Sequence, residues 1–161
     1  MKRLFILILA LLTALMMASC KKAEEPAEPE ADTDSGYRRT TLYYVTEDGF
    51  IVPVMKSIPW EEGIGRAALS YLVSGIDNDK SAAMMGLKTV IPEGTECTLR
   101  IGEGGSARVD LTDIGQQTEE QEQAMVVAIV NTLTEFPSIN NVSITIDGKE
   151  KKTLSNGTDI S

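Results

Sequence analysis

The sequence contains no histidine and only two cysteines, Cys20 and Cys97, in 161 residues. Without histidine, a serine or cysteine nucleophile has no imidazole base to activate it, which argues against Ser-His and Cys-His catalysis. Zinc and other transition-metal sites are disfavoured for a related reason, because they draw on histidine and clustered cysteine. We therefore expect no metal, no cofactor and no nucleophilic triad.

Positive charge and aromatic side chains are also scarce. The formal net charge is -9, and the aromatic residues are one Trp, four Tyr and three Phe. An acidic protein is repelled by nucleic-acid phosphates and by anionic lipid headgroups, so nucleic acid is not an expected partner. The few aromatic rings leave little material for a platform on which sugars would stack.

The N-terminus has the pattern of an export signal. A basic start precedes an apolar run, Leu4 to Leu15, and Met17-Ala18-Ser19 stands directly before Cys20. This order is typical of a secretory signal. Its ending resembles the bacterial lipobox, in which the cysteine is diacylated and becomes the mature N-terminus. We predict a lipoprotein signal peptide over 1–19 and lipidation at Cys20, which would hold the protein at the extracytoplasmic face of the cell membrane. A cleaved signal that leaves a soluble secreted protein is the alternative.

Composition divides the remaining chain into a tether, a domain and a tail. Residues 21–36 hold many acids, two prolines and no apolar side chain larger than alanine. Such a segment cannot form a core, so we predict an acidic, Pro-rich tether over 20–36, counted from the lipidated cysteine. Residues 37–154 should form one folded domain, and residues 155–161 should be a loose C-terminal tail.

The best-marked element is a helix that begins after Thr118. Thr118 stands where an N-cap belongs, and Gln121 can complete a capping box. Apolar residues then recur at helical spacing and should form one buried face, namely Met125, Ile129, Leu133 and Phe136. Pro137 ends the helix, and the alternating residues 142–146 predict a strand that stops at Asp147-Gly148.

Two hairpins precede this helix. Strands over 40–45 and 50–55 flank a turn at Glu47-Asp48-Gly49, and Pro53 indicates that the second of them lies at a sheet edge. Strands over 97–101 and 107–111 flank a glycine-rich loop. Cys97 should share the inner face of its strand with Leu99 and Ile101, as a small buried hydrophobe without special reactivity.

The remaining elements are less regular. A helix should begin at Pro59 and end at Gly75, residues 76–94 should be irregular, and residues 149–154 should form a short charged edge strand. The predicted fold class is α+β. It is a single domain with an antiparallel or mixed β-sheet and two helices packed on one face.

Four short segments resemble one known family in their order and spacing. They are Leu72-Val73-Ser74-Gly75, Leu87 to Thr95, Ala107 to Thr112 and Val142 to Gly148. They are similar to the GerMN domain, the sporulation and spore-germination domain of Gram-positive bacteria. The resemblance implies a non-enzymatic domain of lipoproteins or secreted proteins, with a fold like the ring-building modules of secretion systems. This chain carries one copy.

Three patterns resemble catalytic or binding motifs. Gly102 to Ala107 fits a relaxed dinucleotide fingerprint, but a strand should follow it where the fingerprint needs a helix, which favours a hairpin turn. Asp32-Thr33-Asp34 and Asp77-Asn78-Asp79 begin like calcium loops but lack the later glycine and glutamate. Cleavage of cell-wall glycan by two carboxylates, either Asp110 with Asp113 or Glu61 with Glu62, is the enzymatic alternative, and solvated acids explain these residues as well.

Leu69, Val73 and Val127 fit neither helical stripe. Either residues 76–94 cover them, or they form an exposed patch of the kind that marks a protein interface. They are the candidate interface residues.

The sequence thus predicts a non-catalytic, lipid-anchored assembly or scaffolding module of a bacterial cell-envelope complex, to which the resemblance adds sporulation or spore germination. The expected partner is an envelope or sporulation-complex protein, and self-association into a homo-oligomer is also open. A lipoprotein that binds peptidoglycan or a small ligand is the alternative.

Overall fold

The structure is a computed structural model that describes residues 36–60 and 63–160. These residues belong to one compact unit, Ala31–Ser161. The predicted signal peptide, the lipidated Cys20, the tether up to Ser35, and the acids Glu61 and Glu62 lie outside the described residues.

The first hairpin forms as expected and is longer than the sequence indicated. β1 (Tyr37–Thr46) pairs antiparallel with β2 (Ile51–Pro59), with Leu42 opposite Val54. Leu42 and Tyr44 alternate with more exposed residues and are buried, because their side of the strand faces the core. A two-residue strand, β3 (Leu87–Lys88), joins the other side of β1, so the sheet order is β2-β1-β3.

The second hairpin belongs to a separate sheet with the order β4-β5-β6-β7. β4 (Glu96–Ile101) and β5 (Ser106–Thr112) are antiparallel, and β6 (Asn141–Ile146) runs parallel to β5. β7 (Lys149–Glu150) is the short charged edge strand and is shorter than predicted. The parallel pair needs a crossover connection, and the long helix of the chain supplies it.

That helix, α4 (Glu119–Thr134), confirms the expectation drawn from its capping residues. The Thr118 side chain accepts a hydrogen bond from the backbone N–H of Gln121, and the Gln121 side chain accepts one from the backbone N–H of Thr118. The four residues of the predicted apolar face are all buried: Met125, Ile129, Leu133 and Phe136. The helix ends before Pro137, as the missing N–H of proline requires.

The region between the first hairpin and β4 differs from the expectation. α2 (Ile64–Ser70) is shorter than the predicted helix, and Gly75 does not end it. Gly75 instead stands at the N-cap of a further helix, α3 (Ile76–Ala83), so the prediction that residues 76–94 are irregular was wrong for 76–83 and for the short strand β3. The two helices are bridged by the Asn78 side chain, whose Nδ2 donates 2.8 Å hydrogen bonds to the carbonyls of Ser70 and Val73.

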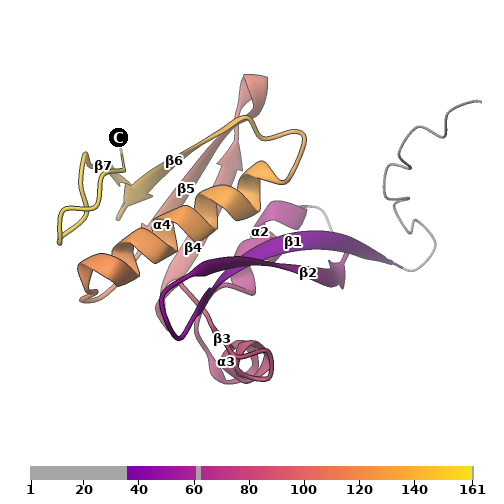
Figure 1. Cartoon of the computed structure of the whole chain (residues 1–161). Helices are drawn as coiled ribbons and strands as arrows, with labels where there is room; N and C mark the ends of the chain where they lie inside the picture. The colour runs from indigo at the N-terminus through magenta and orange to yellow at the C-terminus, as the bar shows by residue number, and fades with distance from the viewer. Residues whose placement is uncertain (1–35, 61–62, 161) are drawn as a thin grey trace, which may run out of the picture. The chain divides into compact units, whose positions relative to one another are not determined.

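The α+β class is confirmed, and its strands divide into two sheets that share one core (Figure 1). α4 contacts β1, β2 and β6, while α2 contacts β2 and β4, so both helices touch both sheets. Buried residues of α2, α4, β1, β2 and β6 form one hydrophobic cluster, and the half-buried Cys97 and Leu99 of β4 pack against it. The helices therefore connect the first hairpin to the four-stranded sheet.

The C-terminal residues are not loose, which corrects the prediction for 155–161 as far as Ile160. Glu122, on the first turns of α4, is almost fully buried, and its carboxylate accepts hydrogen bonds from the backbone N–H and the side-chain amide of Asn156. Thr153 and Asp159 form an isolated β-bridge, and Leu154 is buried. A buried carboxylate needs such donors, and the tail supplies them.

Candidate interaction surfaces

The structure separates the three predicted interface residues. Leu69 has no exposed area, so its place in an interface is corrected: it is part of the core. Val73 is half-buried and forms a parallel β-bridge with Ile91. Val127 on α4 is the exposed member of the three, at 42%. Residues 76–94 contact Val73 through its bridge to Ile91 and through Asn78, which donates a hydrogen bond to the Val73 carbonyl.

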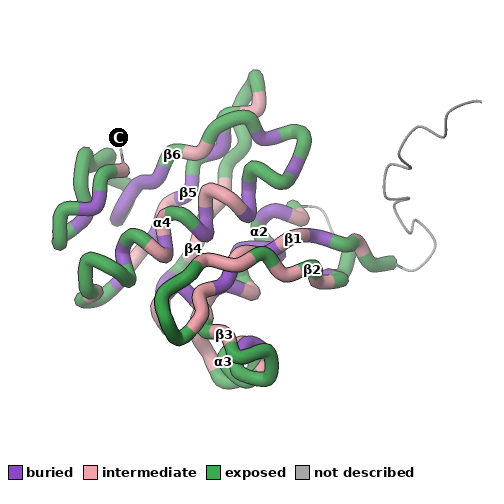
Figure 2. The backbone as a smooth tube through the Cα atoms, viewed as in Figure 1, coloured by how far each residue is buried: buried purple, intermediate pink, exposed green. Residues whose placement is uncertain are grey.

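Of the nine large apolar side chains that are exposed among the described residues, four lie on or next to α3 or on the turn of the first hairpin. Their exposed fractions are 87% for Ile76, 82% for Met84, 69% for Phe50 and 45% for Met85. Met84 and Met85 follow α3 directly and precede β3, which pairs with the end of β1 next to the turn that holds Phe50. Figure 2 shows this part of the chain largely exposed. We call these four residues the apolar tip.

Two of the four segments that carry the family resemblance, Leu72 to Gly75 and Leu87 to Thr95, meet next to α3. The carbonyl of Leu72 accepts hydrogen bonds from the backbone N–H groups of Val90 and Ile91, at 3.1 and 2.9 Å. The hydroxyls of Ser74 and Thr89 lie 2.6 Å apart, and Thr89 donates to a carboxylate oxygen of Asp79, also at 2.6 Å. These residues hold α3 in place, which is a structural role.

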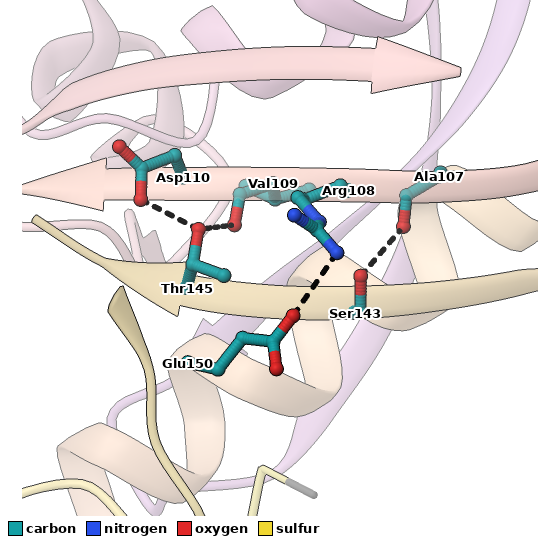
Figure 3. A network of polar contacts seen from close by, with 7 residues as sticks. All are labelled: Ala107, Arg108, Val109, Asp110, Ser143, Thr145 and Glu150. Atoms are coloured by element: carbon teal, nitrogen blue, oxygen red, sulfur yellow. Dashed lines mark hydrogen bonds and ion pairs between the residues drawn. The ribbon is translucent and has the colours of Figure 1, made fainter. Parts of the chain in front are cut away.

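The outer face of the four-stranded sheet carries a polar network (Figure 3). Asp110 Oδ1 accepts a 2.6 Å hydrogen bond from the Thr145 hydroxyl and a 2.8 Å bond from the Gly148 backbone N–H. Arg108 forms an ion pair with Glu150 at 3.1 Å. The network borders a shallow depression of about 160 Å³ that is lined by Thr98, Arg100, Arg108, Asp110, Thr145 and Gly148. Ligand pockets for small molecules usually measure roughly 300–1,000 Å³, so this depression is small for such a site.

The carboxylate pair Asp110 and Asp113 is not built like a catalytic pair. Asp110 is engaged with β6 and the turn after it, where it holds two strands together. Asp113 lies one residue beyond the end of β5, is exposed, and adopts a positive φ of 58°. The hydrogen bonds that Asp110 accepts thus give this carboxylate a structural role.

The glycine-rich loop after β4 is a hairpin turn, as the sequence indicated. β5 follows it directly, so no helix N-terminus faces the loop. Asn140 fastens the loop to the chain before β6, because its N–H donates to the Gly105 carbonyl and its side-chain amide to the Gly104 carbonyl. A Cβ atom at Gly105 would lie 2.7 Å from the Ser138 carbonyl oxygen, so this close approach requires glycine.

The second of the two acidic runs that begin like calcium loops is part of α3, where its side chains bond within the fold. Asp79 accepts a hydrogen bond from the Gly75 backbone N–H at 3.0 Å, in addition to the bond from Thr89. Within 36–60 and 63–160 there is no group of three or more potential ligand side chains placed to hold a metal ion. The run Asp32-Thr33-Asp34 lies outside the described residues.

Burial and hydrogen bonding shift the pKa values of three groups upward. Burial raises the pKa of the Cys97 thiol to about 11. Burial, with a smaller contribution from nearby Tyr71, raises the pKa of Tyr44 to about 12. A 2.8 Å hydrogen bond to Glu135 raises the pKa of Tyr43. All three groups are therefore neutral at pH 7, and Cys97 behaves as the half-buried, unreactive thiol that its strand position predicts.

Taken together, the described residues define an α+β domain with two sheets, an exposed apolar tip and a polar network that holds neighbouring strands together. The chain belongs to the Germane family, described as sporulation and spore germination, because the family model matches residues 41–152. The match extends from β1 to just beyond β7.

Relatives and solved structures agree with this membership. The chain is 30% identical over 134 residues to the spore germination protein GerM of Bacillus subtilis (strain 168), covering 83% of this chain and 36% of that protein. It thus spans about a third of that curated relative. The first GerMN domain of GerM from Bacillus subtilis matches with a TM-score of 0.70 and 31% identity, over 76% of this chain and 93% of that one. The tandem GerMN domains match with the same TM-score and 30% identity, over 78% of this chain and 45% of theirs.

No helix in the described part of the chain combines the length and the apolar character that crossing a membrane requires. The apolar run at the N-terminus lies outside that part.

Proposed function

We propose that the chain is a non-catalytic, lipid-anchored module on the extracytoplasmic face of the membrane, where it helps assemble a protein complex of sporulation or spore germination. Family membership and the similarity to a spore germination protein support the process. The lipobox-like sequence that ends at Cys20 supports the anchor.

The apolar tip is the observation that carries the assembly role. Soluble domains rarely expose several large apolar side chains together unless these bind something. Ile76, Met84 and Met85 lie on and just after one short helix, with Phe50 on the neighbouring turn. Methionine side chains are flexible and polarisable, which suits them to a protein partner's apolar surface.

The surroundings of the apolar tip favour a protein partner over bare lipid. α3 carries Asp77 and Asp79 in its first turn, and the hairpin turn carries Glu47 and Asp48. These acids would be repelled by anionic headgroups, whereas they can form a polar rim around an apolar contact with a protein. Glu47 already pairs with Lys88 at 3.3 Å.

A crosslinking pulldown from native membranes tests this proposal. The full-length tagged chain would be compared with the double variant Met84→Glu, Met85→Glu and with Val127→Glu as the matched control, because Val127 is an exposed apolar residue on α4. We expect the parent and Val127→Glu to enrich one defined envelope protein, and the double variant to lose it. A parallel Cys20→Ala arm reports whether capture requires the anchor.

Two results would overturn the proposal. Equal capture by the double variant would remove the apolar tip from the contact. Recovery of peptidoglycan fragments without a protein partner would favour the wall-binding alternative, for which the small depression on the sheet offers the nearest site.

A further inference from the structure

The two sheets have four outer strand edges, and three of them are blocked. β3 is only two residues long. Beyond it, α4 covers part of the same side of β1, where the Thr132 hydroxyl accepts a 3.0 Å hydrogen bond from the backbone N–H of Tyr43. β7 is two residues long and charged. β2 carries Pro53 and Pro59. Short, charged and proline-bearing edges are known devices against unwanted strand pairing.

The prolines of β2 lie at positions where a backbone N–H would point out of the sheet. Trp60 donates its backbone N–H to the Gly36 carbonyl at 2.8 Å, so the next pair along the hairpin, Tyr37 with Pro59, is a non-hydrogen-bonded pair. Pro53 lies six residues before Pro59 on the same strand, so its pair with Tyr43 is also a non-hydrogen-bonded pair. Both prolines thus stand at positions whose N–H would otherwise point out of the sheet, and the outer edge lacks two donors.

β4 is six residues long and has no proline, and its two charged side chains, Glu96 and Arg100, are of opposite sign. No strand among residues 36–60 and 63–160 pairs with its outer side. Gly102 donates its N–H to the Ser106 carbonyl at 2.8 Å, so these two residues form a hydrogen-bonded pair. Hydrogen-bonded and non-hydrogen-bonded pairs alternate along an antiparallel ladder, so Cys97, Leu99 and Ile101 are in non-hydrogen-bonded pairs with β5 and their backbone N–H and C=O groups point outward. The edge therefore presents a complete set of donors and acceptors, and Ile101 is also 52% exposed.

The sequence of β4 is complementary to itself when it is reversed. Glu96 and Arg100 lie at equal distances on either side of Thr98, and all three are exposed on the outer face. If two copies of β4 pair antiparallel about Thr98, Glu96 of each copy stands opposite Arg100 of the other. The pairing is consistent with the outward backbone groups, because Cys97 and Leu99 then form the hydrogen-bonded pairs.

We propose that β4 is a self-association edge, at which two copies of this chain pair antiparallel about Thr98 and join their four-stranded sheets into one. Opposite charges directly across an antiparallel pair stabilise it. The contact also relieves a like-charge juxtaposition within the chain, because Arg100 lies opposite Arg108 across β4 and β5. Arg108 has Glu150 as its partner, while Arg100 has no ion-pair partner among the described residues.

This dimer is a weak contact that a membrane would strengthen. One strand edge with two exposed ion pairs buries little area, so the isolated chains should dimerise only at high concentration. Attachment to one membrane surface raises the effective concentration of each copy around the other. The inference stands apart from the proposed partner at the apolar tip, because it concerns a different element and a second copy of the same chain.

Disulfide trapping in native membranes tests the register. The full-length chain would carry Cys97→Ser, to remove the nearby thiol, together with Thr98→Cys. In a non-hydrogen-bonded pair the two Cα atoms at position 98 lie about 4.5 Å apart, and disulfides form at roughly 4.4–6.8 Å. Ser143→Cys in the same background is the matched control, since Ser143 is exposed on the same face of the sheet but two strands further in.

We expect a severalfold higher yield of crosslinked dimer for Thr98→Cys than for Ser143→Cys or for Cys97→Ser alone. Equal yields at the two positions would overturn the proposal. A crosslink from position 98 to a different protein would show that the edge binds another occupant, which would overturn it as well.

Charge reversal tests the two ion pairs and the register. In the Thr98→Cys background, Arg100→Glu alone and Glu96→Arg alone should each abolish the dimer band, because like charges would face each other across the contact. The combined swap, Glu96→Arg with Arg100→Glu, should restore it. Arg100→Glu also converts the Arg100–Arg108 pair to opposite charges, so loss of fold does not explain its effect. Single reversals that leave the band unchanged would refute the ion pairs and the register.

Discussion

The hairpins β1–β2 and β4–β5 are both antiparallel and both leave one strand at a sheet edge. In the first hairpin, prolines remove outward donors from β2, and α4 covers β1. In the second hairpin, β4 keeps every outward donor and places Glu96 and Arg100 symmetrically about Thr98. The same local structure is closed in one place and open in the other. The residues along the outer side of the edge strand therefore decide whether that edge can pair with another strand, and they do so without changing the fold.

β1 and β4 also differ in how deeply their inner side chains are buried. Leu42 of β1 has no exposed area, whereas Leu99 of β4 is half-buried at the open edge. We expect Leu42→Ala to lower the free energy of unfolding by about 2–5 kcal/mol, as for large-to-small changes in a core. Leu99→Ala should cost clearly less. Urea unfolding of both variants measures this, and equal losses would show that the β4 edge is as enclosed as β1.

The hydrogen bond between α4 and β1 offers a second test of the difference between the closed and the open edge. Thr132 is fully buried, and its hydroxyl accepts the Tyr43 N–H. Thr132→Val keeps the shape and removes the acceptor, so a buried donor is left unsatisfied at a cost of about 1–3 kcal/mol. Thr134→Val is the control, because that exposed hydroxyl bonds only within α4. If both variants unfold at the same urea concentration, the hydrogen bond does not stabilise the closed edge.

A proline placed in β4 at an outward N–H position, as in β2, should prevent pairing at the open edge. Ile101 is exposed, and its backbone N–H points outward, so Ile101→Pro removes no hydrogen bond to β5. Stability should change by no more than about 0.5 kcal/mol, the usual range for surface sites. The Thr98→Cys crosslink should nevertheless disappear. Ile101→Thr, which keeps the N–H, is the control and should retain the crosslink.

The elements that could be predicted from the sequence are those with local causes. The capping box and the apolar face of α4 lie within one helix, and each hairpin has its own alternation and turn. α3 was missed because its support comes from elsewhere: Asn78 bonds to the end of α2, and Asp79 to Thr89. Its own residues are mostly polar and give no amphipathic pattern.

Two residues show the effect of long-range contacts. Glu122 lies in the acidic first turns of α4, yet it is buried and accepts hydrogen bonds from Asn156 of the tail. Leu69 fits neither helical stripe in the sequence, yet it is part of the core. The candidate interface depends on which apolar residues remain uncovered after such contacts form, so no local pattern could have pointed to the apolar tip.

The smallest effect expected at the β4 edge concerns the reactivity of Cys97, and it leaves the fold unchanged. Burial raises the pKa of this thiol from 9.0 to about 11, and only the thiolate is alkylated. At pH 8 the folded chain should therefore react with iodoacetamide about a hundredfold more slowly than the chain unfolded in urea, since two pKa units separate the states. The rate should rise about tenfold per pH unit until the pH approaches the raised pKa. Mass spectrometry of the Cys97 peptide over time gives the rate. A folded-state rate equal to the unfolded one would mean that the edge exposes the thiol fully, which would make β4 more open than its half-buried inner side chains indicate.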